Sequence, residues 1–145
     1  MWFLFPFKHG LEKQRKQELL AFQKKAGCKF KNISLLDIAF HHRSFSNEHS
    51  DSPINNERLE FLGDSVLGMI VAAELYLAHP EKPEGDLAKI KAAVVSEDSL
   101  FPIALNLNID KYLMLGHGEE VSGGRKKKAL LADALEALIG ALYLD

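Results

Sequence analysis

The chain has 145 residues, of which 47% are hydrophobic and 26% are charged, and its formal net charge is −2. This composition excludes a disordered chain and an integral membrane protein, and the length is that of one domain with a sizeable core. We therefore expect a single domain over residues 1–145. Because the charge balance gives no general attraction to nucleic acid, binding of a polyanion would have to use local basic patches.

The N-terminal stretch MWFLFPF is apolar, but it is far shorter than the roughly 20 residues that cross a membrane, and no basic residue precedes it. We expect its aromatic side chains to pack on the domain or on a partner subunit, with a membrane-surface anchor as the less favoured alternative. The single Cys28 cannot form an intramolecular disulfide, which fits a reducing cytoplasm. The sequence thus predicts a cytoplasmic protein that does not cross a membrane.

Helical periodicity dominates the chain and alternating β-branched runs are few, so we predict an all-α fold. Two loops interrupt the helical pattern, a polar one over 43–53 and a glycine-punctuated one over 115–128. Six segments have the pattern of helices: residues 11–27, 34–42, about 56–78, 86–96, a stretch after 96, and 129–144.

Several residues give local expectations within these helices. Ser34 and Asp37 have the spacing of a capping box. Pro102 is expected to kink its helix or delay the start of that helix. The long central helix is apolar almost all the way round from Leu59 onward, which indicates a helix buried inside a bundle. Gly63 costs about 1 kcal/mol relative to alanine at mid-helix, so we expect another helix to approach closely there.

Acidic residues interrupt the apolar surfaces of two helices. Glu57, Glu60 and Asp64 are three and four residues apart, so they share one face of the central helix. Asp133 and Glu136 are arranged in the same way in the last helix. Burying unpaired carboxylates costs several kcal/mol each, so these groups need cations as partners.

The positive charge that offsets these carboxylates has two possible sources. Arg58, Lys89 and Lys91 would neutralise the acids as structural salt bridges, or oxygen ligands from the two helices would bind a hard divalent cation. A set of carboxylates without cysteine or histidine favours Mg²⁺ or Mn²⁺ over zinc.

The sequence also contains a series of motifs that resemble one known family. The segment NERLEFLGDSVL at residues 56–67 resembles the signature of the ribonuclease III family. Four other segments are similar to family motifs in order and spacing: LLDIAFHHRS at 35–44, EGDLAKIKAAVVS at 84–96, GHGEEVSGGR at 116–125 and LADALEALIGALYLD at 131–145. The resemblance covers nearly the whole chain, with Lys91 standing where the family more often has arginine.

The resemblance implies a helical endonuclease domain that forms a symmetric homodimer and hydrolyses double-stranded RNA with Mg²⁺, which Mn²⁺ is expected to replace. It implies 5′-phosphate and 3′-hydroxyl ends with short 3′ overhangs, produced from ribosomal RNA precursors and other structured transcripts, including messenger RNA. Asp64 and Glu136 are implied to be catalytic. The implied metal ligands are Glu60, Asp64, Asp133 and Glu136.

Other residues receive supporting roles from the same resemblance. Glu57 and Glu84 are implied to be supporting acids near the RNA or across the dimer, and Phe61 is implied to pack across the dimer axis. Asn56 is either a helix N-cap or a residue near the RNA or the metal. Ser44 belongs to a segment with a structural or RNA-proximal role.

A basic segment, GGRKKK at residues 123–128, precedes the acidic last helix. A charge run of this kind is either a solvated loop or a surface that grips phosphates, with affinity that falls with salt and without sequence information. The residues that we expect to bind RNA are Arg125, Lys126, Lys127 and Arg43.

Three further hypotheses are weighed against an active nuclease. The first is a catalytically silent domain of the same fold that binds double-stranded RNA or serves assembly. The second, a phosphohydrolase of the histidine-aspartate type, is disfavoured because none of the six histidines is followed by aspartate. The third is a helical bundle with salt-bridged acids. Typical family members continue into a separate double-stranded RNA-binding domain, so we expect this chain to be an excised catalytic domain rather than a natural short form.

Overall fold

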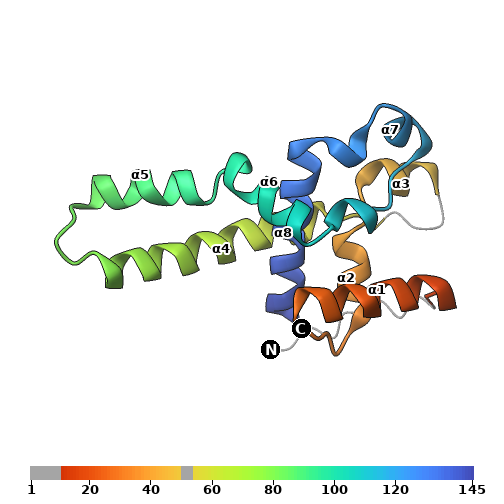
Figure 1. Ribbon diagram of the computed structural model, residues 1–145, viewed down its shortest axis with the longest axis horizontal. Helices are drawn as coiled ribbons and strands as arrows, with labels where there is room; N and C mark the ends of the chain where they lie inside the picture. Colours follow the sequence, from red (N-terminus) through yellow and green to blue (C-terminus); the bar gives the residue numbers. More distant parts are fainter. Residues whose placement is uncertain (1–10, 50–53) are drawn as a thin grey trace.

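The structure is a computed structural model that describes residues 11–49 and 54–145 (Figure 1). Within these residues it is helical, and the one β contact is an isolated bridge between His41 and Met114. The predicted all-α fold is therefore confirmed, whereas the expected packing of the N-terminal aromatic residues lies outside the described part. The elements are α1 (Lys13–Ala26), α2 (Ile33–Ala39), α3 (Arg43–Glu48), α4 (Glu57–Ala78), α5 (Glu84–Val94), α6 (Glu97–Asn106), η1 (Ile109–Lys111), α7 (His117–Val121), η2 (Gly124–Lys126) and α8 (Lys128–Leu144).

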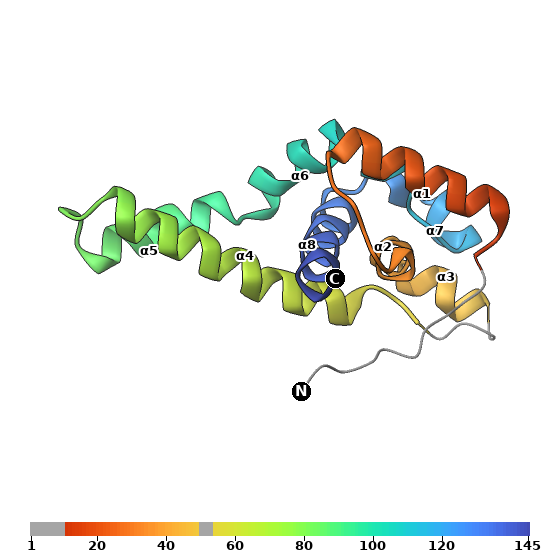
Figure 2. The ribbon, with the colours of Figure 1, turned by 90° about the horizontal axis from the view of Figure 1, so that it is seen from below.

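Helix α8 is the centre of the body, and it crosses the first half of α4 (Figures 1 and 2). It also packs on α6 and α2, which explains why its sequence is apolar on nearly every side. The core continues from α8 to α1 through aromatic rings, since Phe22 meets both Phe40 and Tyr112 edge to face. The largest fully buried side chains are Phe22, Phe40, Leu19, Leu36, Ile109 and Leu131.

Two glycines make the crossing of α4 and α8 possible. A Cβ atom on Gly63 would overlap the backbone carbonyl of Glu136, and one on Gly140 would overlap the carbonyl of Leu59. Only residues without a side chain can fit there, so the close helix approach predicted at Gly63 is confirmed. This contact fixes the distance between the two acidic helices.

The second half of α4 leaves the body and pairs with α5 as a projecting hairpin (Figures 1 and 2). The expectation that α4 lies inside a bundle is therefore wrong, because its apolar face extends beyond the part that α8 covers. Phe61, Met69, Tyr76 and Leu77 are exposed. By length and composition alone α4 would also suffice for a membrane span, and it is the single helix of the described residues that passes this test.

Local details also differ from the expectations. Asn32, and not Ser34, caps α2, because its side chain accepts a hydrogen bond from the Ser34 amide. Pro102 lies inside α6 without delaying its start, since Ser96 caps the helix through the Ser99 amide. The short helices α3 and α7 lie within segments that were predicted to be loops.

Candidate metal centre

Carboxylates from α4 and α8 meet where the two helices cross. Glu60, Asp133 and Glu136 each offer an oxygen atom, and these three atoms lie within 4.8 Å of one another. All three side chains are half-buried. We call Glu60, Asp133 and Glu136 the acidic cluster.

Asp64 lies one helical turn after Glu60 and is exposed. It is not one of the three residues with converging oxygens, but its charge raises the pKa of both Glu60 and Glu136. The structure therefore brings three of the four predicted ligands together and places the fourth beside them.

The pKa values report how these carboxylates affect one another. Burial, followed by the charges of Asp64, Asp133 and Glu60, raises the pKa of Glu136 to about 7. Burial raises the pKa of Glu60 and of Asp133 as well, with added repulsion from neighbouring acids. Burial and mutual repulsion thus make it costly for these carboxylates to be ionised together without a cation.

No basic side chain of the described residues neutralises the acidic cluster. Lys89 is paired with Asp86 at 3.9 Å, and neither Arg58 nor Lys91 forms an ion pair within residues 11–49 and 54–145. The salt-bridge hypothesis is therefore wrong for these residues. Converging, half-buried carboxylate oxygens are the donor set that a hard divalent cation requires, so the residues present fit such an ion.

Glu97, the first residue of α6, is an acid that the sequence reasoning did not select. Its charge contributes to the raised pKa of Asp133, so it lies near the acidic cluster. An acid in the first turn of a helix is also what the helix dipole favours. The sequence alone therefore gave no reason to assign it to the site.

Comparison with known proteins identifies the family. The family described as Ribonuclease-III-like matches residues 32–145. The chain is 67% identical over 142 residues to a Ribonuclease 3 of Treponema denticola, covering 98% of this chain and 58% of that protein. A Ribonuclease 3 of Treponema pallidum is 56% identical over 137 residues, covering 93% and 54% respectively. This chain belongs to the ribonuclease III family.

A solved nuclease domain of ribonuclease III from Campylobacter jejuni has the same fold, with a TM-score of 0.79 and 41% sequence identity. The match covers 85% of this chain and 82% of that one, and that structure is described as flexible in a region involved in dimer formation. The resemblance inferred from the motifs is thus confirmed. The chain spans between half and two thirds of the length of the curated relatives it matches.

The two supporting acids of the ribonuclease III motifs lie in different places. Glu57 is exposed at the start of α4, 3.6 Å from Arg43, and its charge raises the pKa of Glu60. Glu84 is exposed at the start of α5, which lies at the end of the hairpin away from α8 (Figure 1). Within one chain the structure therefore brings Glu57, but not Glu84, to the acidic cluster.

Asn56 occupies the N-cap position of α4, but its side chain does not cap the helix. Its amide donates to the Ala39 carbonyl at 3.3 Å, and its backbone N–H donates to the His41 carbonyl at 2.9 Å. The helix is instead capped by Asn55, whose side-chain oxygen accepts a hydrogen bond from the Glu57 amide at 3.1 Å. Asn56 is therefore buried as a link between α4 and the end of α2.

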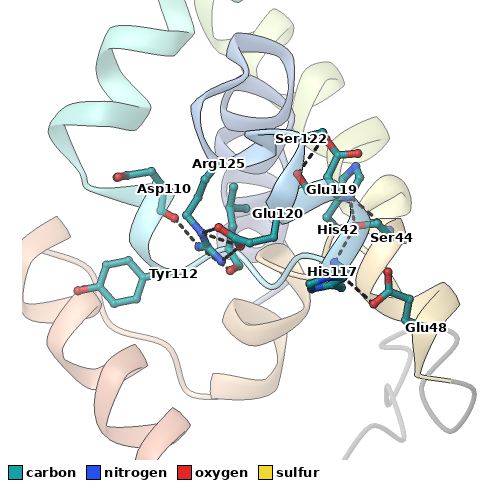
Figure 3. A network of polar contacts seen from close by, with 12 residues as sticks. His42, Ser44, Glu48, Asp110, Tyr112, His117, Glu119, Glu120, Ser122 and Arg125 are labelled. Atoms are coloured by element: carbon teal, nitrogen blue, oxygen red, sulfur yellow. Dashed lines mark hydrogen bonds and ion pairs between the residues drawn. The ribbon is translucent and has the colours of Figure 1, made fainter.

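The histidine-arginine-serine segment joins α3 to the glycine-rich loop (Figure 3). The Ser44 hydroxyl accepts from the Gly116 amide at 2.9 Å and lies 2.8 Å from Nδ1 of His42. Glu48 accepts from the His117 amide at 2.7 Å. Burial lowers the pKa of His42, which favours the neutral ring. In that form Nδ1 of His42 accepts a hydrogen bond from the Ser44 amide at 3.2 Å. These contacts hold the segment that contains His42 and Ser44 against the glycine-rich loop.

The basic segment is partly committed to contacts within the chain. The Arg125 guanidinium pairs with Glu120 and donates to the carbonyls of Asp110 and Leu113 at 2.7 and 2.9 Å (Figure 3). Lys127 pairs with Glu119 at 2.6 Å. The predicted contact of these residues with RNA stays a prediction.

Two of the predicted RNA-binding residues face the solvent. Lys126 is exposed and, within the described residues, forms no salt bridge or side-chain hydrogen bond. The Arg43 side chain is 67% exposed despite its ion pair with Glu57. Both cations are therefore accessible to a large anionic ligand.

Phe61 projects from α4 with 77% of its surface exposed. It borders a pocket of about 620 Å³ between α4, α2 and the end of α8. Besides Phe61, the apolar residues that line this pocket are Leu35, Ile38, Ile54, Leu59, Leu62 and Leu144.

Proposed function

We propose that this chain is a divalent-metal-dependent endoribonuclease domain that hydrolyses double-stranded RNA. The acidic cluster is the observation that carries the proposal: three carboxylates of two helices converge and have no basic partner among the described residues. Membership of the ribonuclease III family supports the same reaction. The proposed substrates are ribosomal RNA precursors and other structured transcripts.

We assign the carboxylates of Glu60, Asp133 and Glu136, together with the adjacent Asp64, as the ligands of Mg²⁺, which Mn²⁺ replaces. When bound, the cation supplies Lewis-acid chemistry, because it lowers the pKa of water and offsets negative charge on the phosphodiester. The protein contributes rigid placement, since Gly63 and Gly140 fix the distance between the two helices that hold the ligands.

The raised pKa of Glu136 makes metal binding dependent on pH. A cation held by Glu136 would compete with the proton for the same carboxylate oxygens, so the affinity of the site for metal would rise as pH increases toward the pKa of about 7. Hydrolysis that leaves a 3′-hydroxyl and a 5′-phosphate requires cleavage of the bond between phosphorus and the 3′ oxygen. Asp64 is exposed beside the acidic cluster, which leaves it accessible to an RNA backbone.

We assign Lys126, Lys127 and Arg43 to contacts with RNA phosphates, with Arg125 holding the loop that carries the first two. Such contacts supply affinity that falls with salt and do not read base sequence. Double-stranded RNA presents shape and 2′-hydroxyls more readily than base edges, so weak sequence preference is expected.

We further propose a symmetric homodimer formed through the exposed face of α4. In a two-fold interface the same patch meets its own copy, so the protruding Phe61 and the neighbouring apolar pocket suit each other. The exposed Met69, Tyr76 and Leu77 extend this face along the hairpin. An apolar surface of this kind also accounts for the membrane-like composition of α4 without a membrane.

The test is incubation of the purified protein with a long RNA duplex and Mg²⁺ at low salt. We expect cutting that requires the metal and is abolished by Glu136→Gln, which removes the charge and keeps the shape. Duplex that is bound but never cut would instead assign the catalytically silent function. Duplex that is neither cut nor bound would contradict both proposals.

A further inference from the structure

Lys91 of α5 lies against α4 at Gly68. The Cε and Nζ atoms of Lys91 are both 3.4 Å from the position that a Cβ atom on Gly68 would take. No other side chain of the described residues comes within 4 Å of that position. Gly68 is buried and Lys91 is half-buried, so the missing side chain of Gly68 leaves the space in which the end of Lys91 lies.

This position continues the line of acids along α4. Residues four apart share one face of a helix, so Glu60, Asp64 and Gly68 form a row in which each step advances about 6 Å along the axis. The end of Lys91 is therefore about one helical turn beyond Asp64. A strand that presents its scissile phosphate to the acidic cluster and continues along α4 would reach Lys91 next.

Among the residues that the structure describes, the Lys91 ammonium group has no polar partner. Across residues 11–49 and 54–145 it forms neither an ion pair nor a side-chain hydrogen bond, whereas Lys89, on the same helix, is 85% exposed and paired with Asp86 at 3.9 Å. A half-buried lysine with no counter-ion is held in place by packing and keeps its three donors available. An anionic oxygen of the substrate can therefore bind to it.

We propose that Lys91 binds the backbone phosphate next to the scissile one and so positions the RNA strand along α4, with Gly68 providing the space for its side chain. This inference rests on the proposed function, because it concerns the same RNA at the same site. A phosphate contact of this kind fixes the position of the strand and reads no sequence. Since a single point charge is sufficient, arginine can replace Lys91.

The test compares three variants made in the non-cleaving Glu136→Gln background: Lys91→Gln, Lys91→Arg and, as the matched control, Lys89→Gln. Binding to a short RNA duplex is measured by fluorescence anisotropy with Mg²⁺ over a range of salt concentrations. We expect Lys91→Gln to weaken binding several-fold. The salt slope, which is the magnitude of the slope of log binding constant against log salt concentration, should fall by about 0.7 to 0.9 for each lysine that contacts the duplex. Lys89→Gln is expected to change neither quantity, and Lys91→Arg to retain both.

The outcomes separate the inference from the proposed function. If the unmodified protein cuts duplex RNA but Lys91→Gln and Lys89→Gln bind alike, the inference alone is wrong. Weaker binding by Lys91→Gln with an unchanged salt slope, or with a lowered melting temperature, would assign Lys91 to helix packing and would also overturn it. If the unmodified protein neither cuts nor binds duplex, the proposed function and the inference fall together.

Discussion

At the scale of single residues, Glu136 carries the clearest electrostatic consequence. Its pKa of about 7 lies well above the ordinary value of 4.5, because burial and the neighbouring acids favour the protonated form. The folded chain therefore holds this proton more tightly than the unfolded chain does. Without metal, the free energy of unfolding should fall as pH rises from about 4.5 to about 7.

Glu136→Gln should remove most of this decrease, because glutamine keeps the shape of the side chain without the charge. We expect the variant to melt about 2 to 6 °C higher than the unmodified protein at pH above 7 in a chelator, and to differ little at acidic pH. Thermal melts followed by circular dichroism across this pH range provide the measurement. Equal melting temperatures of the variant and the unmodified protein at every pH would show that the Glu136 carboxylate is not destabilised by burial or by its acidic neighbours.

The helix crossing depends on Gly63. Gly63→Ala places a methyl group on the backbone carbonyl of Glu136, which no side-chain rotation can relieve, so we expect a loss of about 3 kcal/mol or more in the free energy of unfolding. Gly85→Ala is the control, because nothing lies within 4 Å of a Cβ atom there. Urea unfolding of both variants tests this, and a loss below about 1 kcal/mol for Gly63→Ala would mean that the helices can separate freely.

The role of an individual residue could be predicted where that residue is unfavourable for the helix or the apolar face that contains it. Gly63 could be predicted because glycine weakens a long helix, and the acids because they interrupt apolar faces. Glu97 could not be predicted, since an acid that starts a helix has an ordinary explanation. The pairing of Lys91 with the space over Gly68 depends on how α4 and α5 pack, which no local pattern contains.

At the scale of elements, the basic segment before α8 combines two roles that mutation should separate. Arg125→Ala removes an ion pair and two hydrogen bonds to carbonyls, so we expect a loss of about 2 kcal/mol in stability. Lys126→Ala should leave stability unchanged and weaken the binding of duplex RNA. Urea unfolding and duplex binding, measured on both variants, test this division, and a reversed pattern would exchange the two assignments.

Short elements were the ones that sequence patterns missed. Helices α3 and α7 have six and five residues, and their contacts come from elsewhere in the chain, such as Ser44 to Gly116 and Glu48 to His117. The long helices were predicted because their periodicity is repeated over several turns. For α4 the pattern gave the extent of the apolar face correctly, but it could not give the partner of that face.

At the scale of the whole molecule, the projecting hairpin and its exposed apolar face predict an assembly. Phe61→Glu should convert a dimer into a monomer, because a buried charge with no partner would replace an aromatic ring at the interface. Leu20→Glu on α1 is the matched control, since Leu20 is 50% exposed and lies away from α4. Light scattering measures the mass directly. A monomeric unmodified protein, or a dimer that survives Phe61→Glu, would contradict the proposed interface.

The central claim is that the acidic side chains of α4 and α8 hold a divalent cation. Soaking crystals in Mn²⁺ and calculating an anomalous difference map tests it most directly. We predict a peak between the two helices, in contact with carboxylate oxygens of Glu60, Asp133 and Glu136. A map without such a peak, in which arginine or lysine side chains instead occupy the space between these carboxylates, would contradict the account.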